Sequence, residues 1–325
     1  MATQSVFQYV CQQVVIYVGL FLFIAGLISG LLTLLVFLSL RTFRQKSCAF
    51  YLTIMSLVNT FHLFTGLFTY IMINGFGINW LNMSLFYCKF RPFYVQLCTL
   101  ISFSCMCLAT IDQFFATCSY IRWQRLSNIK LARYILVVIT LAAILHGIPS
   151  IFSYGHISSP TTGENNCIIM NIAFRKYYYY FYVPVLQSTL PISIMILFGI
   201  LAYRNVQQIA FRTIPLVRRE LDKQLTTMVL VQIFYDAIVV TPSVFINIIM
   251  TIYGSTSNSL LAAQLDSISV LGIILYYFHY SGSFYIYVCV SKRFRQQFLY
   301  VLSTIHVTQC CRLTINNNQI QTETS

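Results

Sequence analysis

The stretch that decides the fold runs from Cys88 to Gln113 and reads CKFRPFYVQLCTLISFSCMCLATIDQ. It carries no charged residue between Arg91 and Asp112. A helix rises about 1.5 Å per residue, so the residues from Cys88 to Asp112 cover roughly 36 Å, which is enough to cross a bilayer. The stretch therefore predicts a membrane-spanning helix with a cysteine near one end and an aspartate near the other.

The composition of the whole chain agrees with this prediction. Hydrophobic residues make up 58% of the 325 residues, charged residues only 8%, and the mean hydropathy is +0.74. So little polar surface excludes a soluble fold of this size and indicates a membrane protein with several spans. The net charge of +13 does not indicate a nucleic-acid partner, because the basic residues form short clusters between apolar runs without a repeated basic-aromatic pattern.

Seven apolar runs predict an all-α bundle of seven transmembrane helices, at 14–40, 47–73, 92–118, 131–154, 177–203, 225–253 and 260–290. The first run is too long for a signal-peptide core, so we expect it to be uncleaved. The basic amphipathic segment SKRFRQQFLYVL that follows predicts a short helix on the membrane surface. The expected organisation is an N-terminus at 1–13, a bundle with its surface helix at 14–303, and a tail at 304–325.

The positive charges predict the orientation. The segments after the first, third and fifth runs and the tail hold 3, 4, 5 and 4 basic residues, which is 16 of the 20. Lys and Arg accumulate on the cytoplasmic side of helical membrane proteins. We therefore expect an extracellular N-terminus, a cytoplasmic C-terminus, and Cys88 and Cys167 on the same outer side.

Cysteine and aspartate at this spacing resemble the third helix of rhodopsin-like (class A) G-protein-coupled receptors, and the similarity covers most of the chain. The further matching features are LRTFRQ at 40–45, the helix prolines Pro149, Pro191 and Pro242, the tyrosine Tyr287, and Phe294, which would dock the surface helix. The resemblance implies a plasma-membrane receptor that passes the binding of an extracellular ligand to a heterotrimeric G protein, without a cofactor and without enzymatic activity.

The resemblance also implies modifications of the chain. It predicts a disulfide between Cys88 and Cys167, with Cys11 as the only competing outer thiol. Asn82-Met83-Ser84 is a glycosylation sequon on the same side, close to the helices. In the tail, Cys310 and Cys311 are either palmitoylated or remain reduced thiols.

The residues of the family's inner switch are altered in this chain. Asp112-Gln113-Phe114 replaces the Asp-Arg-Tyr motif, and Asp222 falls at the position of the acid that holds the arginine in the inactive state. Gln113 can hydrogen-bond Asp222 but carries no charge, so the expected lock is weaker. Tyr287 is retained, whereas Ser283 and Phe284 replace the Asn and Pro before it. We expect high basal activity or weak coupling.

Asp236 lies near the middle of the sixth run, where an acid is costly and must face the bundle. The resemblance gathers it with Asn59, Ser102, His279 and Ser283. Two interpretations stay open, a proton or cation switch and a permanently protonated acid that donates one interhelical hydrogen bond. Asn59 stands where the family has an acid, so a sodium site would lose its usual carboxylate. No metal site is predicted, since His62 and His146 lack a second ligand at helical spacing.

Two ligand classes are excluded by the resemblance. Val95 stands where amine receptors carry an Asp, and Tyr277 stands where opsins carry the retinal lysine. A peptide or a small chemosensory molecule remains. The candidate residues for the ligand mouth are Gln96, Thr99, Arg175, Lys176, Tyr177, Tyr180, Gln187, Asp266 and Ser269.

Three other functions are alternatives to a coupled receptor. A transporter or channel predicts paired charges, broken helices or an internal repeat in the membrane, but the sequence has one such acid and no repeat. An intramembrane hydrolase needs a motif such as His-Glu-x-x-His, which is absent from the sequence. A decoy or scaffold of the same fold that does not couple is the third alternative.

Overall fold

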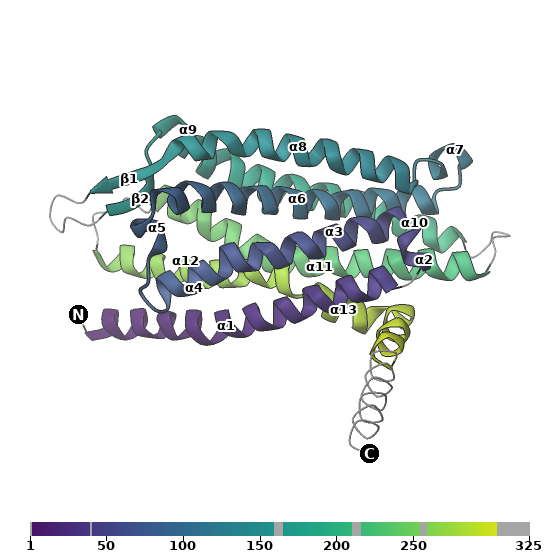
Figure 1. Ribbon diagram of the computed structural model, residues 1–325, viewed down its shortest axis with the longest axis horizontal. Helices are drawn as coiled ribbons and strands as arrows, with labels where there is room; N and C mark the ends of the chain where they lie inside the picture. Colours follow the sequence, from purple (N-terminus) through teal and green to yellow (C-terminus); the bar gives the residue numbers. More distant parts are fainter. Residues whose placement is uncertain (1, 40, 159–164, 210–215, 254–258, 304–325) are drawn as a thin grey trace, which may run out of the picture.

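A computed structural model of the chain describes residues 2–39, 41–158, 165–209, 216–253 and 259–303. Long helices run side by side along one axis and form an elongated bundle (Figure 1). Their bounds are α1 Ala2–Ser39, α2 Arg41–Arg44, α3 Ser47–His62, η1 Leu63–Leu67, α4 Phe68–Asn74, α5 Trp80–Met83, α6 Leu85–Thr117, α7 Ile121–Gln124, α8 Ile129–Ser153, α9 Ile172–Tyr177, η2 Tyr178–Thr189, α10 Leu190–Ile209, α11 Leu216–Tyr253, α12 Ser259–Ser281 and α13 Ser283–Val290.

The described residues contain six helical segments that are long and apolar enough to cross a membrane. A seventh span is obtained when the pair Ser267–Ser281 and Ser283–Val290, which is bent by 51°, is taken as one. The predicted seven-helix bundle is therefore confirmed. The disulfide end of the bundle, at the start of α6, and the Asp112 end, near α7, lie at opposite ends of the long axis (Figure 1).

Two helices begin earlier than the sequence predicted. The first starts at Ala2, so residues 2–13, expected as a separate N-terminus, continue α1. The third starts at Leu85 because the Ser84 hydroxyl accepts a hydrogen bond from the Tyr87 backbone N–H, which caps the new end. Pro92 is accommodated inside this longer helix.

Three interruptions shape the spans. The segments η1 and η2 are π-helices, in which backbone hydrogen bonds reach one residue further than in an α-helix. In η2 the Thr189 hydroxyl donates to the Pro184 carbonyl at 2.6 Å. The bend between α12 and α13 falls at Gly282, where a Cβ atom would overlap the Tyr235 ring. Because Gly282 has no side chain, the Tyr235 ring lies at this place, and its hydroxyl donates a hydrogen bond to the Phe278 carbonyl.

A two-stranded antiparallel hairpin at the disulfide end was not predicted. It consists of β1, Tyr154–Ser158, and β2, Asn165–Ile169, with His156 opposite Cys167. The predicted disulfide between Cys88 and Cys167 is present and ties β2 to α6. The competing thiol, Cys11, is buried and its sulfur contacts the Ser267 carbonyl.

The Asn82 side chain also holds this hairpin. Its Oδ1 accepts from the Cys167 backbone N–H at 3.0 Å, and its Nδ2 donates to Asn166 Oδ1 at 3.1 Å. A glycan on the sequon would be attached to the same Nδ2 and would disturb these contacts. In this structure Asn82 therefore positions the hairpin.

The surface helix occupies residues 292–303 and turns away from the bundle axis (Figure 1). Phe294, which is fully buried, docks it as predicted. Its ring packs against Phe37, Phe284 and Tyr287, with centroids 5.4 to 5.9 Å apart. The tail at 304–325, with Cys310 and Cys311, lies outside the described residues.

Replacing Cys167 by Ser is expected to lower the unfolding midpoint of the purified chain in detergent. The disulfide closes a loop of 79 residues, and removing such a cross-link costs about 2–4 kcal/mol, chiefly by freeing the unfolded state. Cys289→Ser, at an exposed free thiol, is the matched control. Equal midpoints for wild type and Cys167→Ser would contradict a structural role for the bridge.

Candidate functional site

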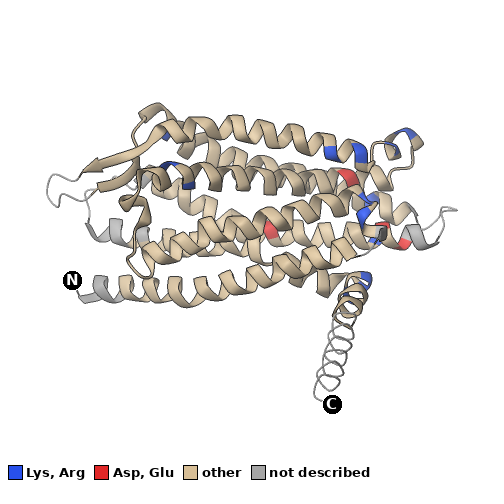
Figure 2. Ribbon diagram, in the orientation of Figure 1, with Lys and Arg blue, Asp and Glu red and all other residues tan. Residues whose placement is uncertain are grey.

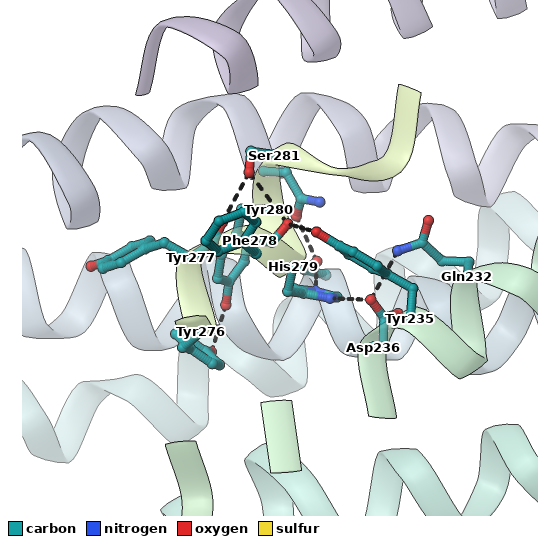
Figure 3. A network of polar contacts seen from close by, with 11 residues as sticks. Gln232, Tyr235, Asp236, Tyr276, Tyr277, Phe278, His279, Tyr280 and Ser281 are labelled. Carbon is teal, nitrogen blue, oxygen red and sulfur yellow. Dashed lines mark hydrogen bonds and ion pairs between the residues drawn. The ribbon is translucent and has the colours of Figure 1, made fainter. Parts of the chain in front are cut away.

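The centre of the bundle holds a buried pair of titratable side chains. Asp236 of α11 and His279 of α12 are both 0% exposed, and His279 Nδ1 lies 2.8 Å from Asp236 Oδ1. Gln232 Nε2, one turn before Asp236, donates to the same oxygen at 2.9 Å (Figure 3). The pair joins α11 to α12 three residues before the bend at Gly282.

The network continues from His279 to two further helices. Ser102 Oγ, on α6, donates to Asn59 Oδ1, on α3, at 2.6 Å and lies 3.5 Å from His279 Nε2. Phe103 stacks on the imidazole with ring centroids 4.5 Å apart. Asn59, Ser102, Asp236 and His279 thus come together, as the resemblance implied.

Hydrogen-bond directions restrict the protons of this network. The Ser102 proton is used toward Asn59, whose Oδ1 is an acceptor, so His279 Nε2 meets Ser102 as the donor. One more proton lies between His279 Nδ1 and Asp236 Oδ1. Whether the carboxyl or the imidazole carries it, the pair as a whole has no net charge, which lowers the cost of burying it in a membrane.

The network also has unused hydrogen-bonding capacity. Five of its buried polar atoms have no partner among the described residues, namely Asp236 Oδ2, Gln232 Oε1, Asn59 Nδ2, Ser283 Oγ and Tyr287 OH. Ser283 is buried as predicted, but its hydroxyl is not bonded to the other members. Because an unsatisfied buried polar group costs about 1–3 kcal/mol, a second packing that pairs these atoms would gain stability.

At the Asp112 end, the expected contact between Gln113 and Asp222 is replaced by a different contact for each of these two side chains. Gln113 is buried, and its Oε1 accepts a hydrogen bond from Thr226 at 2.9 Å instead of contacting Asp222. Asp222 pairs with Lys46 Nζ at 2.5 Å. The reason is geometric, since Thr226 lies one turn deeper on α11 than Asp222 and within reach of the short glutamine.

The Lys46 to Asp222 ion pair joins the start of α3 to α11. The two side chains are 23% and 8% exposed, so the pair is largely shielded from water. Asp112 is 7% exposed and interacts with the Ser127 side chain and the Cys48 backbone. Tyr287 is fully buried against Phe37.

The structure brings some of the predicted mouth residues together. Gln96 Nε2 lies 3.0 Å from His146 Nδ1, and the other nitrogen of that ring lies 2.5 Å from the Tyr177 hydroxyl. Thr99 Oγ1 lies 3.2 Å from the Tyr280 hydroxyl, which in turn contacts Tyr276.

Other predicted mouth residues do not join this set. Tyr180 is 64% exposed, and Arg175 and Lys176 are exposed as well. Gln187 interacts with Tyr276. The Asp266 side chain lies outside the described residues.

Sequence reasoning missed Lys46 and Gln232. Gln232 precedes Asp236 by one helical turn, so the sequence carried a local signal for their contact. Lys46 and Asp222 are 176 residues apart, and the sequence carries no signal for their pairing.

Comparison with known proteins gives one family. A family model described as "7 transmembrane receptor (rhodopsin family)" matches residues 29–311. No curated protein matches the chain.

Removing one member of the central pair is expected to destabilise the purified chain strongly. Asp236→Ala and His279→Ala each leave a buried polar partner without its contact, at a cost of about 3–5 kcal/mol. The double variant is expected to lose less unfolding free energy than the sum of the losses in the two single variants, by about 1–3 kcal/mol. The measurement is apparent unfolding free energy in detergent.

His146→Ala is the control, because the partners of His146 are Gln96 and Tyr177. When it is combined with Asp236→Ala, the losses of unfolding free energy in the two single variants should add. Strict additivity between the Asp236 and His279 replacements would contradict the energetic coupling of the pair.

Proposed function

This chain belongs to the rhodopsin family of seven-transmembrane receptors, and we propose that it carries the signal of an extracellular ligand from its disulfide end to a heterotrimeric G protein at its Asp112 end. The proposed orientation in the plasma membrane has the disulfide end outside. It is supported by the basic residues, most of which gather at the Asp112 end (Figure 2). A disulfide at the other end fits an oxidising exterior.

The observation that carries the proposed mechanism is the ion pair between Lys46 and Asp222. Family members hold their inner end closed with an arginine at the position of Gln113. Gln113 carries no charge, so the closing electrostatic contact on Asp222 comes from another helix. We infer that Lys46 replaces the missing arginine and holds α11 against α3 in the inactive packing.

In this mechanism the ligand shifts a two-state equilibrium. Activation separates Asp222 from Lys46 and moves the inner end of α11, which opens a cleft for the G protein. The contact between Asp236 and His279 passes the movement of α11 to α12 and its bend. The unpartnered polar atoms around Ser283 and Tyr287 supply the new partners of the active packing.

The proposed ligand is a small chemosensory molecule or a short peptide. Val95 and Tyr277, which stand at the positions of the amine-binding acid and the retinal lysine, support neither an amine nor retinal. The aromatic set around His146 and Tyr280 supports a ligand with apolar surface and a few polar groups.

Lys46→Gln is expected to raise agonist-free second-messenger output several-fold in cells at matched surface expression. The substitution removes a largely shielded ion pair that contributes about 1 kcal/mol. The free-energy difference between the closed and the open receptor is expected to fall by about that amount. Lys46→Arg keeps the charge and should stay near wild type. Lys223→Gln, at an exposed neighbour of Asp222, is the control, and an equal rise in that variant would refute the specific lock.

Gln113→Arg is expected to lower agonist-free output. A longer, charged side chain at this position can reach Asp222, one turn from its present partner Thr226, and adds a second closing contact. Gln113→Leu removes the hydrogen bond without adding charge and should not lower the output. Unchanged output in Gln113→Arg would count against the lock, and silence in this variant, in Lys46→Gln and in wild type alike would favour a non-coupling decoy.

A further inference from the structure

Charge is distributed unevenly along the bundle. At the disulfide end lie four basic residues, Lys89, Arg91, Arg175 and Lys176. The outer segments of the sequence also hold two acids, Glu164 and Asp266, which leaves a surplus of two positive charges at this end. The acidic side chains that the structure describes lie in the middle of the bundle or at the Asp112 end (Figure 2). A surplus of positive charge at the mouth attracts anions.

Arg91 differs from the exposed Arg175 and Lys176 because its side chain is partly buried against another helix. Its Nε donates to the Thr65 carbonyl at 3.1 Å and its Nη2 to the Gly66 carbonyl at 3.2 Å. These two contacts use two of the five N–H donors of the guanidinium, so the other three can bind a ligand. Among the residues whose side chains the structure describes, no carboxylate pairs with Arg91, so this partly buried cation has no counter-ion within that part of the chain.

Further polar groups surround the same point of the fold. Gly66 has no side chain, and a Cβ atom there would lie 2.9 Å from the Tyr277 hydroxyl and 3.2 Å from His62 Nε2. Both groups therefore border Gly66, the residue whose carbonyl accepts a hydrogen bond from Arg91. His62 is 0% exposed, and neither of its ring nitrogens has a partner among the described residues.

Tyr70 extends this group. Its buried hydroxyl is likewise without a partner in the described part of the chain, and its ring lies 6.2 Å from that of Tyr277. Buried polar groups in folded proteins are normally hydrogen-bonded, so several that have no partner among the described residues, beside a partly buried cation, indicate a site for a further polar group.

We propose that Arg91 binds the carboxylate of the ligand, with His62, Tyr70 and Tyr277 contacting its adjacent polar atoms. The planar guanidinium matches the two oxygens of a carboxylate. Both a small organic acid and the C-terminus of a short peptide present this group. The inference rests on the proposed receptor function, because it names the class of ligand that the receptor takes.

Binding to the purified full-length chain in detergent tests this inference without any G protein. The probes are benzoate, octanoate and N-acetyl-leucyl-leucine, each beside its neutral primary amide, and the readout is the unfolding midpoint over a range of probe concentrations. At least one acid is expected to raise the midpoint of wild type while its amide does not. The peptide and the two simple acids distinguish the two sources of carboxylate.

Arg91→Gln is expected to abolish the acid-dependent shift, and Arg91→Lys to weaken the apparent affinity about tenfold, because a lysine loses the paired contact. Arg122→Gln, at an exposed site on α7 at the opposite end of the bundle, is the matched control and should keep the shift. If Arg91→Gln does not fold, Gly66→Ala provides the second test, because its methyl group enters the space beside Tyr277 and His62 and should weaken binding at least several-fold.

The inference is overturned if no acid shifts wild type, if acid and amide act alike, or if Arg91→Gln or Gly66→Ala binds the acid as wild type does. An acid-dependent shift in a chain that gives no second-messenger signal would retain this site and reject the coupling mechanism. The two proposals therefore fail separately.

Discussion

The hydrocarbon core of a membrane offers no hydrogen-bond partners, so each polar side chain inside this bundle depends on the protein itself for its partner. Asp236 shows the consequence most clearly, because a carboxyl at this depth is retained only with His279 and Gln232 around one of its oxygens. The neutral pair joins α11 to α12 beside the bend at Gly282. Ser102 extends the connection to α6 and α3.

The same constraint explains how the Asp112 end accommodates a glutamine at the position where the family carries an arginine. Gln113 is buried and takes Thr226 as its partner, which satisfies the hydrogen bond but supplies no charge for Asp222. Lys46, at the start of another helix, supplies that charge. In the proposed mechanism the closing contact therefore comes from a different helix and keeps the same acid.

Much of the fold was predictable because apolar runs, the spacing of Cys88 to Asp112 and the position of Phe294 are local or periodic features of the sequence. Helix starts were less predictable, since the start at Leu85 depends on the cap by Ser84. The residues of the central site were anticipated, but not that the Ser283 hydroxyl lies outside the hydrogen bonds that join Asn59, Ser102, Asp236 and His279 in the described part of the chain. Tertiary packing leaves no pattern in the sequence. The pairing of Lys46 with Asp222 and the position of Arg91 beside a π-helix were therefore not predictable.

The most direct measurement of the central claim is the distance between α3 and α11 at the Asp112 end of the bundle. Spin labels at the exposed positions Gln45 and Lys223, in a chain whose Cys289, Cys310 and Cys311 are replaced by Ser, report this distance by double electron-electron resonance. The account predicts one dominant short distance with Lys46 present and a second, longer population in Lys46→Gln. Superimposable distance distributions in the two chains would contradict it.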